Sequence, residues 1–121
     1  MEPNFILLYV SNPQSSTHFY RQLLQRSPVE SSPTFSMFTL QSGVMLGLWA
    51  KHAVLPVSEV QGGASELAIA VSNRQAVDAC YADWIKLNIP MLQIPTELDF
   101  GYTFVGVDPD GHRLRIFAPH S

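Results

Sequence analysis

The chain has 121 residues, a length that fits one domain with a single buried core. Hydrophobic residues make up 46 % of it and charged residues 14 %, which excludes an intrinsically disordered chain. Ten acidic residues stand against seven Lys and Arg, and no basic cluster is present, so we expect no nucleic-acid partner.

The first apolar run, FILLYV from Phe5, predicts a strand. It is too short for a signal-peptide core or a membrane span, and Glu2 stands where a signal peptide would have a basic residue. The single cysteine, Cys80, excludes an internal disulfide and is typical of a reducing compartment. We therefore expect a soluble cytoplasmic protein with no membrane partner.

The next segment, VSNPQSSTHFYRQLL from Val10, predicts a helix. Ser11 is placed to cap it, with Gln14 three residues later, and Pro13 suits its first turn. Further on, "SGV" predicts a hairpin turn before the strand that starts at Gly43. Residues 51–64 contain a Gly-Gly pair and read as a linker.

The second half repeats this order. VSNRQAVDACYADWI from Val71 matches the first helix segment, again after an apolar run, and Ser72 is placed to cap it. Downstream, GHRLRIFA from Gly111 matches GVMLGLWA from Gly43. Two matches in the same order indicate an internal duplication. Each half then reads strand, helix, strand, strand, strand, which predicts an α+β fold.

The acidic stretch DPDG, from Asp108 to Gly111, allows two interpretations, a metal loop or a turn. Pro and Gly stand where a tight turn accepts them, and the Asp108 carboxylate can accept hydrogen bonds from the turn's own amides. A calcium loop would need more oxygen ligands, whereas His112 and Arg113 follow. We therefore predict a turn.

A tandem βαβββ repeat that ends in FVGVDPDGHRLRIF resembles the vicinal oxygen chelate superfamily of glyoxalase I, extradiol dioxygenases, fosfomycin resistance enzymes and bleomycin-binding proteins. The resemblance covers nearly the whole chain. It implies one domain over residues 1–121, with module one at 1–50, a linker at 51–64 and module two at 65–121. It also implies curved mixed sheets that form a cup, and a homodimer whose cups are completed at the subunit interface.

Members of that superfamily that use a metal place ligands on four equivalent strands. Carried over, the resemblance puts Phe5, Gly47, Glu66 and Arg115 at these positions, and the repeat aligns Phe5 with Glu66 and Gly47 with Arg115. Phenylalanine and glycine offer no ligand, and a guanidinium repels a cation. A shift of one residue on the first and fourth strands supplies no ligand set either. We predict no metal and no cofactor.

The four histidines do not change this expectation, because no two have metal-ligand spacing on one element. We interpret them as solvated or capping residues: His18, His52, His112 and His120.

In place of a metal, the resemblance leaves Glu66 and Arg115 together at the centre of the cup, where an ion pair could form. Such a pair could be structural, because a buried arginine needs a carboxylate. It could equally be a recognition device that opens for a polar ligand.

Strand alternation extends the predicted cup to further side chains, several of them aromatic. The predicted ligand-binding set is Phe5, Leu7, Phe38, Gly47, Trp49, Glu66, Tyr102, Phe104, Arg115 and Phe117. Flat aromatic molecules stack well on such a surface, and Glu66, Glu97 and Asp99 could attract a cationic group. The alternative is that some of these aromatic side chains belong to the core or to the dimer interface.

Three functions follow from this set. The favoured one is a protein without enzymatic activity that binds a small, partly aromatic, antibiotic-type molecule, as bleomycin-binding relatives do. The second is a metal-dependent lyase, isomerase or dioxygenase with Glu66 as a ligand. The third is a metal-free enzyme in which Glu66 is a general base.

Overall fold

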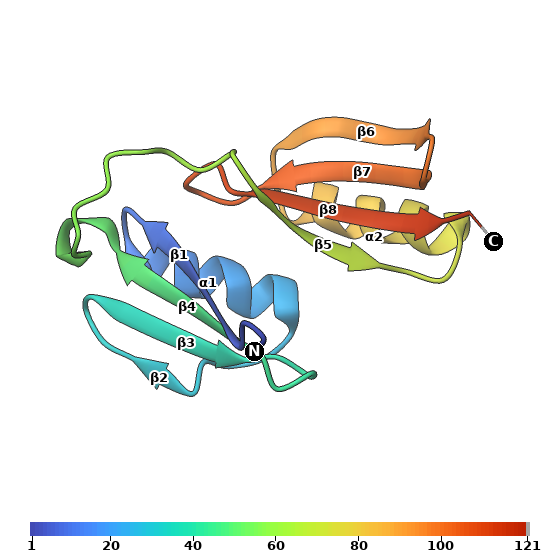
Figure 1. Cartoon of the computed structure of the whole chain (residues 1–121). Coiled ribbons are helices and arrows are strands. Elements are labelled where there is room, and N and C mark those ends of the chain that lie inside the picture. The colour runs from blue at the N-terminus through green and yellow to red at the C-terminus, as the bar shows by residue number, and fades with distance from the viewer. Residues whose placement is uncertain (121) are drawn as a thin grey trace. The chain divides into compact units, whose positions relative to one another are not determined.

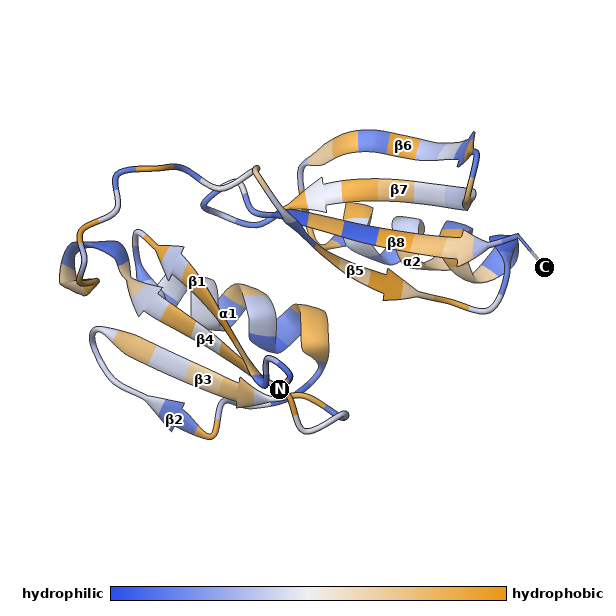
Figure 2. Ribbon diagram, viewed as in Figure 1, coloured by the Kyte–Doolittle hydropathy of each residue, from blue (hydrophilic) through white to orange (hydrophobic). Residues whose placement is uncertain are grey.

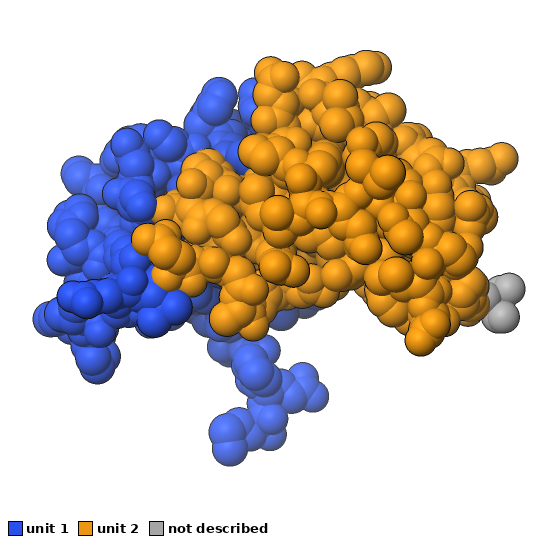
Figure 3. Space-filling model, turned by 90° about the horizontal axis from the view of Figure 1, so that it is seen from above, with its two compact units in different colours: residues 1–60 blue, residues 61–121 orange. Residues whose placement is uncertain are grey.

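In the computed structural model, which describes residues 1–120, each half of the chain contains one long helix and four strands (Figure 1). The first half consists of β1 (Phe5–Val10), α1 (Pro13–Leu24), β2 (Glu30–Ser31), β3 (Phe35–Thr39), β4 (Met45–Ala50) and the short helix η1 (Lys51–Ala53). The second consists of β5 (Glu66–Ala70), α2 (Arg74–Lys86), β6 (Met91–Leu98), β7 (Gly101–Val107) and β8 (Arg113–Pro119). The halves form two compact units, unit 1 at 1–60 and unit 2 from residue 61 onward (Figure 3).

The two units have the same topology. The strand order is β1-β4-β3-β2 in unit 1 and β5-β8-β7-β6 in unit 2. In each, the first strand pairs in parallel with the last strand of the repeat, and the other pairings are antiparallel. The predicted α+β fold with tandem βαβββ modules is therefore confirmed.

The internal duplication also holds at the level of single residues. Phe5 lies opposite Met45, and Glu66 lies opposite Arg113, so both parallel pairs start in the same register. Gly47 and Arg115 are each the third residue of their strand. The predicted alignment of Phe5 with Glu66, and of Gly47 with Arg115, is confirmed.

The DPDG stretch forms a turn within the five-residue loop between β7 and β8. The Asp108 carboxylate Oδ1 accepts hydrogen bonds from the backbone N–H groups of Asp110 and His112, both at 2.9 Å. Gly111 adopts φ of +84°, which favours glycine. Asp108 is 3 % exposed, and the loop satisfies its carboxylate internally, as predicted.

The helix caps differ from the sequence-based prediction. The Asn12 side chain caps α1 by accepting hydrogen bonds from the N–H groups of Gln14 and Ser15, at 3.0 and 3.2 Å. The Asn73 side chain caps α2 by accepting from Ala76 N–H at 2.8 Å. Ser11 and Ser72 therefore lie one residue before the caps, and the prediction that they cap the helices is wrong. Both asparagines have extended backbone, which turns their side chains back over the first turn.

In each unit the core lies between the helix and one face of the sheet, and Figure 2 shows apolar residues alternating with polar ones along the strands. The core of unit 1 consists of Leu8, Val10, Tyr20, Phe38, Leu46, Leu48, Ala50 and Val54. On the helix side of the sheet in unit 2, the core consists of Val77, Trp84, Ile89, Phe104, Leu114, Ile116 and Ala118. No helix in residues 1–120 is long and apolar enough to cross a membrane.

Candidate functional site

Each sheet has a second face, turned away from the helix of its own unit, which we call its open face. In unit 1 the alternate residues of three strands share this face, as the ladder register requires. They are Phe5, Leu7, Tyr9, Phe35, Met37, Thr39, Met45, Gly47 and Trp49.

The open face of unit 1 is aromatic along β1, β3 and β4, and its charged residue, Glu30, lies opposite Met37 on the edge strand β2. Phe5 and Phe35 have ring centroids 6.4 Å apart, and Tyr9 meets Trp49 edge to face at 6.2 Å. Phe5 is 40 % exposed and Tyr9 36 %. Two neighbouring aromatic pairs that still contact water form a surface on which a flat apolar molecule can stack.

Gly47 allows these side chains to lie across the sheet. A Cβ atom at this position would lie 2.8 Å from Leu7 Cδ2 and from Phe5 Cε1, and 3.1 Å from Phe35 Cε1. Any other residue would push these side chains away from the strand. The structure thus shows a steric role for Gly47, because the absence of a side chain leaves room for its neighbours. Contact between Gly47 and a ligand stays a prediction.

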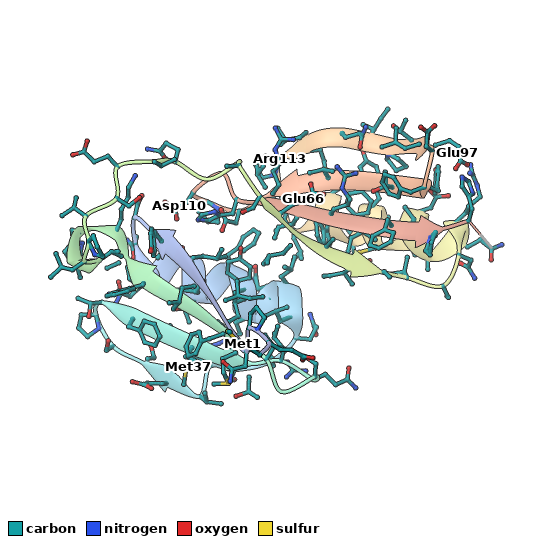
Figure 4. All side chains as sticks on the ribbon, in the orientation of Figure 1. Met1, Met37, Glu66, Glu97, Asp110 and Arg113 are labelled. Carbon is teal, nitrogen blue, oxygen red and sulfur yellow. The ribbon has the colours of Figure 1, made fainter. Side chains whose placement is uncertain are left out.

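The open face of unit 2 is more polar. Its residues, from three strands, are Glu66, Ala68, Ala70, Thr103, Val105, Val107, Arg113, Arg115 and Phe117. Figure 2 shows hydrophilic residues in the first half of β8, and Figure 4 shows Glu66 and Arg113 together at one end of the sheet, with Glu97 at the other.

Glu66 and Arg115 form an ion pair on this face. Arg115 Nε donates to Glu66 Oε1 at 2.7 Å, and Arg115 Nη1 donates to Thr103 Oγ1 at 3.1 Å. The Thr103 hydroxyl in turn donates to the Ile116 carbonyl at 2.8 Å. The Arg115 side chain is 17 % exposed and the Glu66 side chain 34 %. The predicted ion pair is confirmed.

Two phenylalanines lie beside this pair. The ring centroid of Phe100 is 6.0 Å from that of Phe117 and 5.7 Å from the guanidinium carbon of Arg115. Phe100 was not among the predicted site residues, because it lies in the turn between β6 and β7, outside any periodic pattern. Thr103 was not among them either, although counting back from the 108–112 loop places Thr103 opposite Phe117.

The four positions that the resemblance assigns to a metal do not fit one. Phe5 and Gly47 supply no ligand atom, and Glu66 already accepts a hydrogen bond from the Arg115 cation. Within residues 1–120, neither unit contains a group of three or more His, Cys, Asp or Glu side chains that could hold a metal ion. We therefore derive no chemical step through a metal.

Three predicted site residues lie on the helix side of their sheets. Phe38 lies opposite Leu46 in the ladder and is fully buried under α1. Its predicted place on the cup face is therefore wrong. A shift of one residue along a strand moves a side chain to the other face of the sheet. Phe104 is also fully buried and packs edge to face on Trp84 of α2 at 5.1 Å. Both are core residues.

Tyr102 is the third. It donates a hydrogen bond to Asp78 of α2 at 2.7 Å, and this bond raises the pKa of the Tyr102 hydroxyl. The Arg74 guanidinium lies 3.8 Å from its ring centroid. Glu97 pairs with Arg74 and with His120. A surface pocket of about 240 Å³ near the start of α2, away from the open face, is lined in part by Arg74, Glu97, Tyr102 and His120.

The remaining predicted residues, Phe5, Leu7, Gly47, Trp49, Glu66, Arg115 and Phe117, all lie on the open faces, each within its own unit. Their contact with a ligand stays a prediction.

Comparison with known proteins gives three kinds of match. The sequence profile of the Glyoxalase/Bleomycin resistance protein/Dioxygenase superfamily matches residues 3–116. Phenazine antibiotic resistance protein EhpR from Enterobacter agglomerans is 33 % identical over 117 residues, which cover 94 % of this chain and 89 % of EhpR. An Agrobacterium tumefaciens protein of known solution structure is 50 % identical, with a TM-score of 0.92 over 100 % of this chain and 99 % of its own.

A glyoxalase-related enzyme from Fulvimarina pelagi has a TM-score of 0.86 at 20 % identity, over 98 % of this chain and 88 % of its own, and supports the fold alone.

Proposed function

The chain belongs to the Glyoxalase/Bleomycin resistance protein/Dioxygenase superfamily, and we propose that it binds a planar, partly aromatic molecule of the antibiotic type without using a metal. The observation that carries this proposal is the open face of unit 1, where Phe5, Tyr9 and Trp49 offer uncharged aromatic surface. Similarity to Phenazine antibiotic resistance protein EhpR supports the same ligand class, because phenazines are flat fused aromatic rings.

The number of aromatic side chains matters for affinity. An aromatic pair contributes about 0.5–1.5 kcal/mol beyond the burial of its area. A micromolar dissociation constant needs about 8 kcal/mol. One ring could not supply this, so the proposal needs the two aromatic pairs of unit 1 together with the area that the ligand removes from water.

The expected attraction for a cationic group has lost its support. It relied on Glu66, Glu97 and Asp99. The structure pairs Glu66 with Arg115 and Glu97 with Arg74, which leaves only Asp99, in the turn between β6 and β7. A carboxylate that already has a cationic partner attracts a second cation weakly. The proposal therefore keeps the aromatic part of the ligand and not a positive charge.

Two further parts of the proposal rest on the superfamily alone. We propose a homodimer, which light scattering of the purified protein would test, and a cytoplasmic location, which fractionation of the producing cells would test.

An enzymatic function remains the alternative. The observation that favours it is the place of Glu66 on the open face, partly exposed and hydrogen-bonded to Arg115. Conversion of a bound compound by the wild-type protein, absent in Glu66→Gln, would establish this alternative over simple binding.

The test compares the two tryptophans by nuclear magnetic resonance. Trp49 lies on the open face, whereas Trp84 is 5 % exposed in the core. On titration with phenazine, the indole N–H signal of Trp49 should shift and that of Trp84 should stay, with Trp49→Phe used for assignment. A titration in which neither signal moves, or only that of Trp84, would contradict the proposal.

A further inference from the structure

The guanidinium of Arg115 has hydrogen-bond donors that the protein does not use. Of its five N–H groups, Nε serves Glu66 and one on Nη1 serves Thr103. No described residue accepts a bond from Nη2. Among residues 1–120, Ser16 Oγ is the only fully buried side-chain nitrogen or oxygen atom without a hydrogen-bond partner, so Nη2 must contact solvent.

The charge around this group is unbalanced. Arg113 lies on the same open face, directly opposite Glu66 in the ladder, and its guanidinium has no ion pair or hydrogen bond with a described residue. Glu66 is the only carboxylate among the described residues of this open face, and it pairs with Arg115 while Arg113 stays exposed. The open face of unit 2 thus keeps a net positive charge after its ion pair has formed.

The aromatic neighbours indicate the shape of what binds. The rings of Phe100 and Phe117 pack edge to face beside Arg115, and Phe100 is 45 % exposed. A guanidinium with free in-plane donors receives planar anions such as carboxylates, and the adjacent rings receive a flat apolar body. The two requirements meet in a planar aromatic acid.

We propose that the open face of unit 2 binds a planar aromatic anion, and that Arg115 holds its anionic group through Nη while Nε keeps the bond to Glu66. The inference goes beyond the proposed function, which concerns the open face of unit 1, and names the chemical class of a ligand for the open face of unit 2. Glu66 acts here as a positioning residue, because its bond to Nε, together with the bond from Nη1 to Thr103, holds the guanidinium in place. The ion pair therefore serves recognition, as one of the two sequence-based interpretations held, but Glu66 and Arg115 stay paired when the ligand binds.

Calorimetric titration with two matched compounds, phenazine-1-carboxylate and phenazine-1-carboxamide, tests the inference at neutral pH. The compounds have nearly the same shape and differ in charge. A charge-assisted hydrogen bond should make the wild-type protein prefer the acid by about 10- to 100-fold. Arg115→Met should lose this preference. So should the double variant Glu66→Gln/Arg115→Met, which leaves no carboxylate unpaired and guards against a folding defect of the single variant.

Arg74→Met is the control, because Arg74 lies on the helix side of the same unit, and it should keep the preference. Equal affinity of the wild-type protein for acid and amide, or a preference that survives in the double variant, would overturn the inference and leave the proposed function standing. If neither compound binds the wild-type protein, the proposed function fails, and the inference fails with it.

Discussion

Arg115 lies two residues out of register from Glu66 on the neighbouring parallel strand, yet its Nε–H reaches Glu66 Oε1 at 2.7 Å. The residue opposite Glu66 in the ladder is Arg113, which extends into solvent instead. The diagonal pair brings the guanidinium over the middle of the sheet, where Thr103 supports it. The charge at the centre of this face is therefore fixed in position by two hydrogen bonds.

Removing the carboxylate should destabilise the fold. In Glu66→Ala, Arg115 loses its anionic partner while its side chain remains mostly buried, which should cost about 1–2 kcal/mol of unfolding free energy. Urea denaturation measures this. Glu59→Ala, at an exposed linker position, should change stability by less than about 0.5 kcal/mol. Equal stability of both variants would show that the ion pair contributes nothing.

Alanine substitutions at Gly47 and Gly106 should have different effects, one on ligand binding and the other on thermal stability. A methyl group at Gly47 would meet the partly exposed side chains of Leu7 and Phe5, which can move, so Gly47→Ala should weaken phenazine binding with little change in Tm. A methyl group at Gly106 would meet Trp84 and Ile89 in the core, at 3.2 and 3.0 Å, so Gly106→Ala should lower Tm. Calorimetric titration and thermal unfolding of both variants distinguish these effects. The reverse pattern would contradict the assignment of the open face.

The cap of α2 allows a direct comparison of two adjacent residues. Asn73→Ala removes the side chain that accepts from Ala76 N–H and should cost about 1 kcal/mol of unfolding free energy. Ser72→Ala, one residue earlier, should cost much less, because Ser72 has no such bond. Chemical denaturation of the two variants measures the difference, and a larger loss from Ser72→Ala would restore the serine as the cap.

The Cys80 thiol should make stability fall at alkaline pH. Burial, with a contribution from Asp83, raises the pKa of Cys80 from 9.0 to about 11. The unfolded chain then ionises first, so the stabilisation is complete below pH 9 and is lost as the pH rises toward about 11. Urea denaturation at a series of pH values should show the wild-type protein losing stability relative to Cys80→Ala in this window. A constant difference between the two proteins would contradict the burial of the thiol.

The fold is well predicted from the sequence because each helix and strand occurs once in each half, so the two copies can be checked against each other. The match of GVMLGLWA to GHRLRIFA aligns Gly47 with Arg115, and both ladders confirm this register. The DPDG turn was predictable from local chemistry alone, since the Asp108 carboxylate bonds to amides within four residues.

The candidate site was less predictable, because the side of a strand depends on loop length. A two-residue turn after β3 would place Phe38 opposite Gly47 and so on the open face. The residues between Thr39 and Met45 instead form a five-residue loop, so Met37 faces Gly47. The register of β6 shifts twice along its length, which no periodic pattern reveals. Phe100 reaches Arg115 from a turn, so only the folded chain brings them together.

The most direct test of the central claim is a calorimetric titration of the wild-type protein with phenazine before and after exhaustive dialysis against a chelator, with metal content measured in both samples. The account predicts the same Kd in both samples, and binding that is unchanged by added Ni²⁺, Zn²⁺, Mn²⁺ or Fe²⁺. Binding that disappears on chelation, returns with one of these ions and is absent in Glu66→Ala would contradict it and establish Glu66 as a metal ligand.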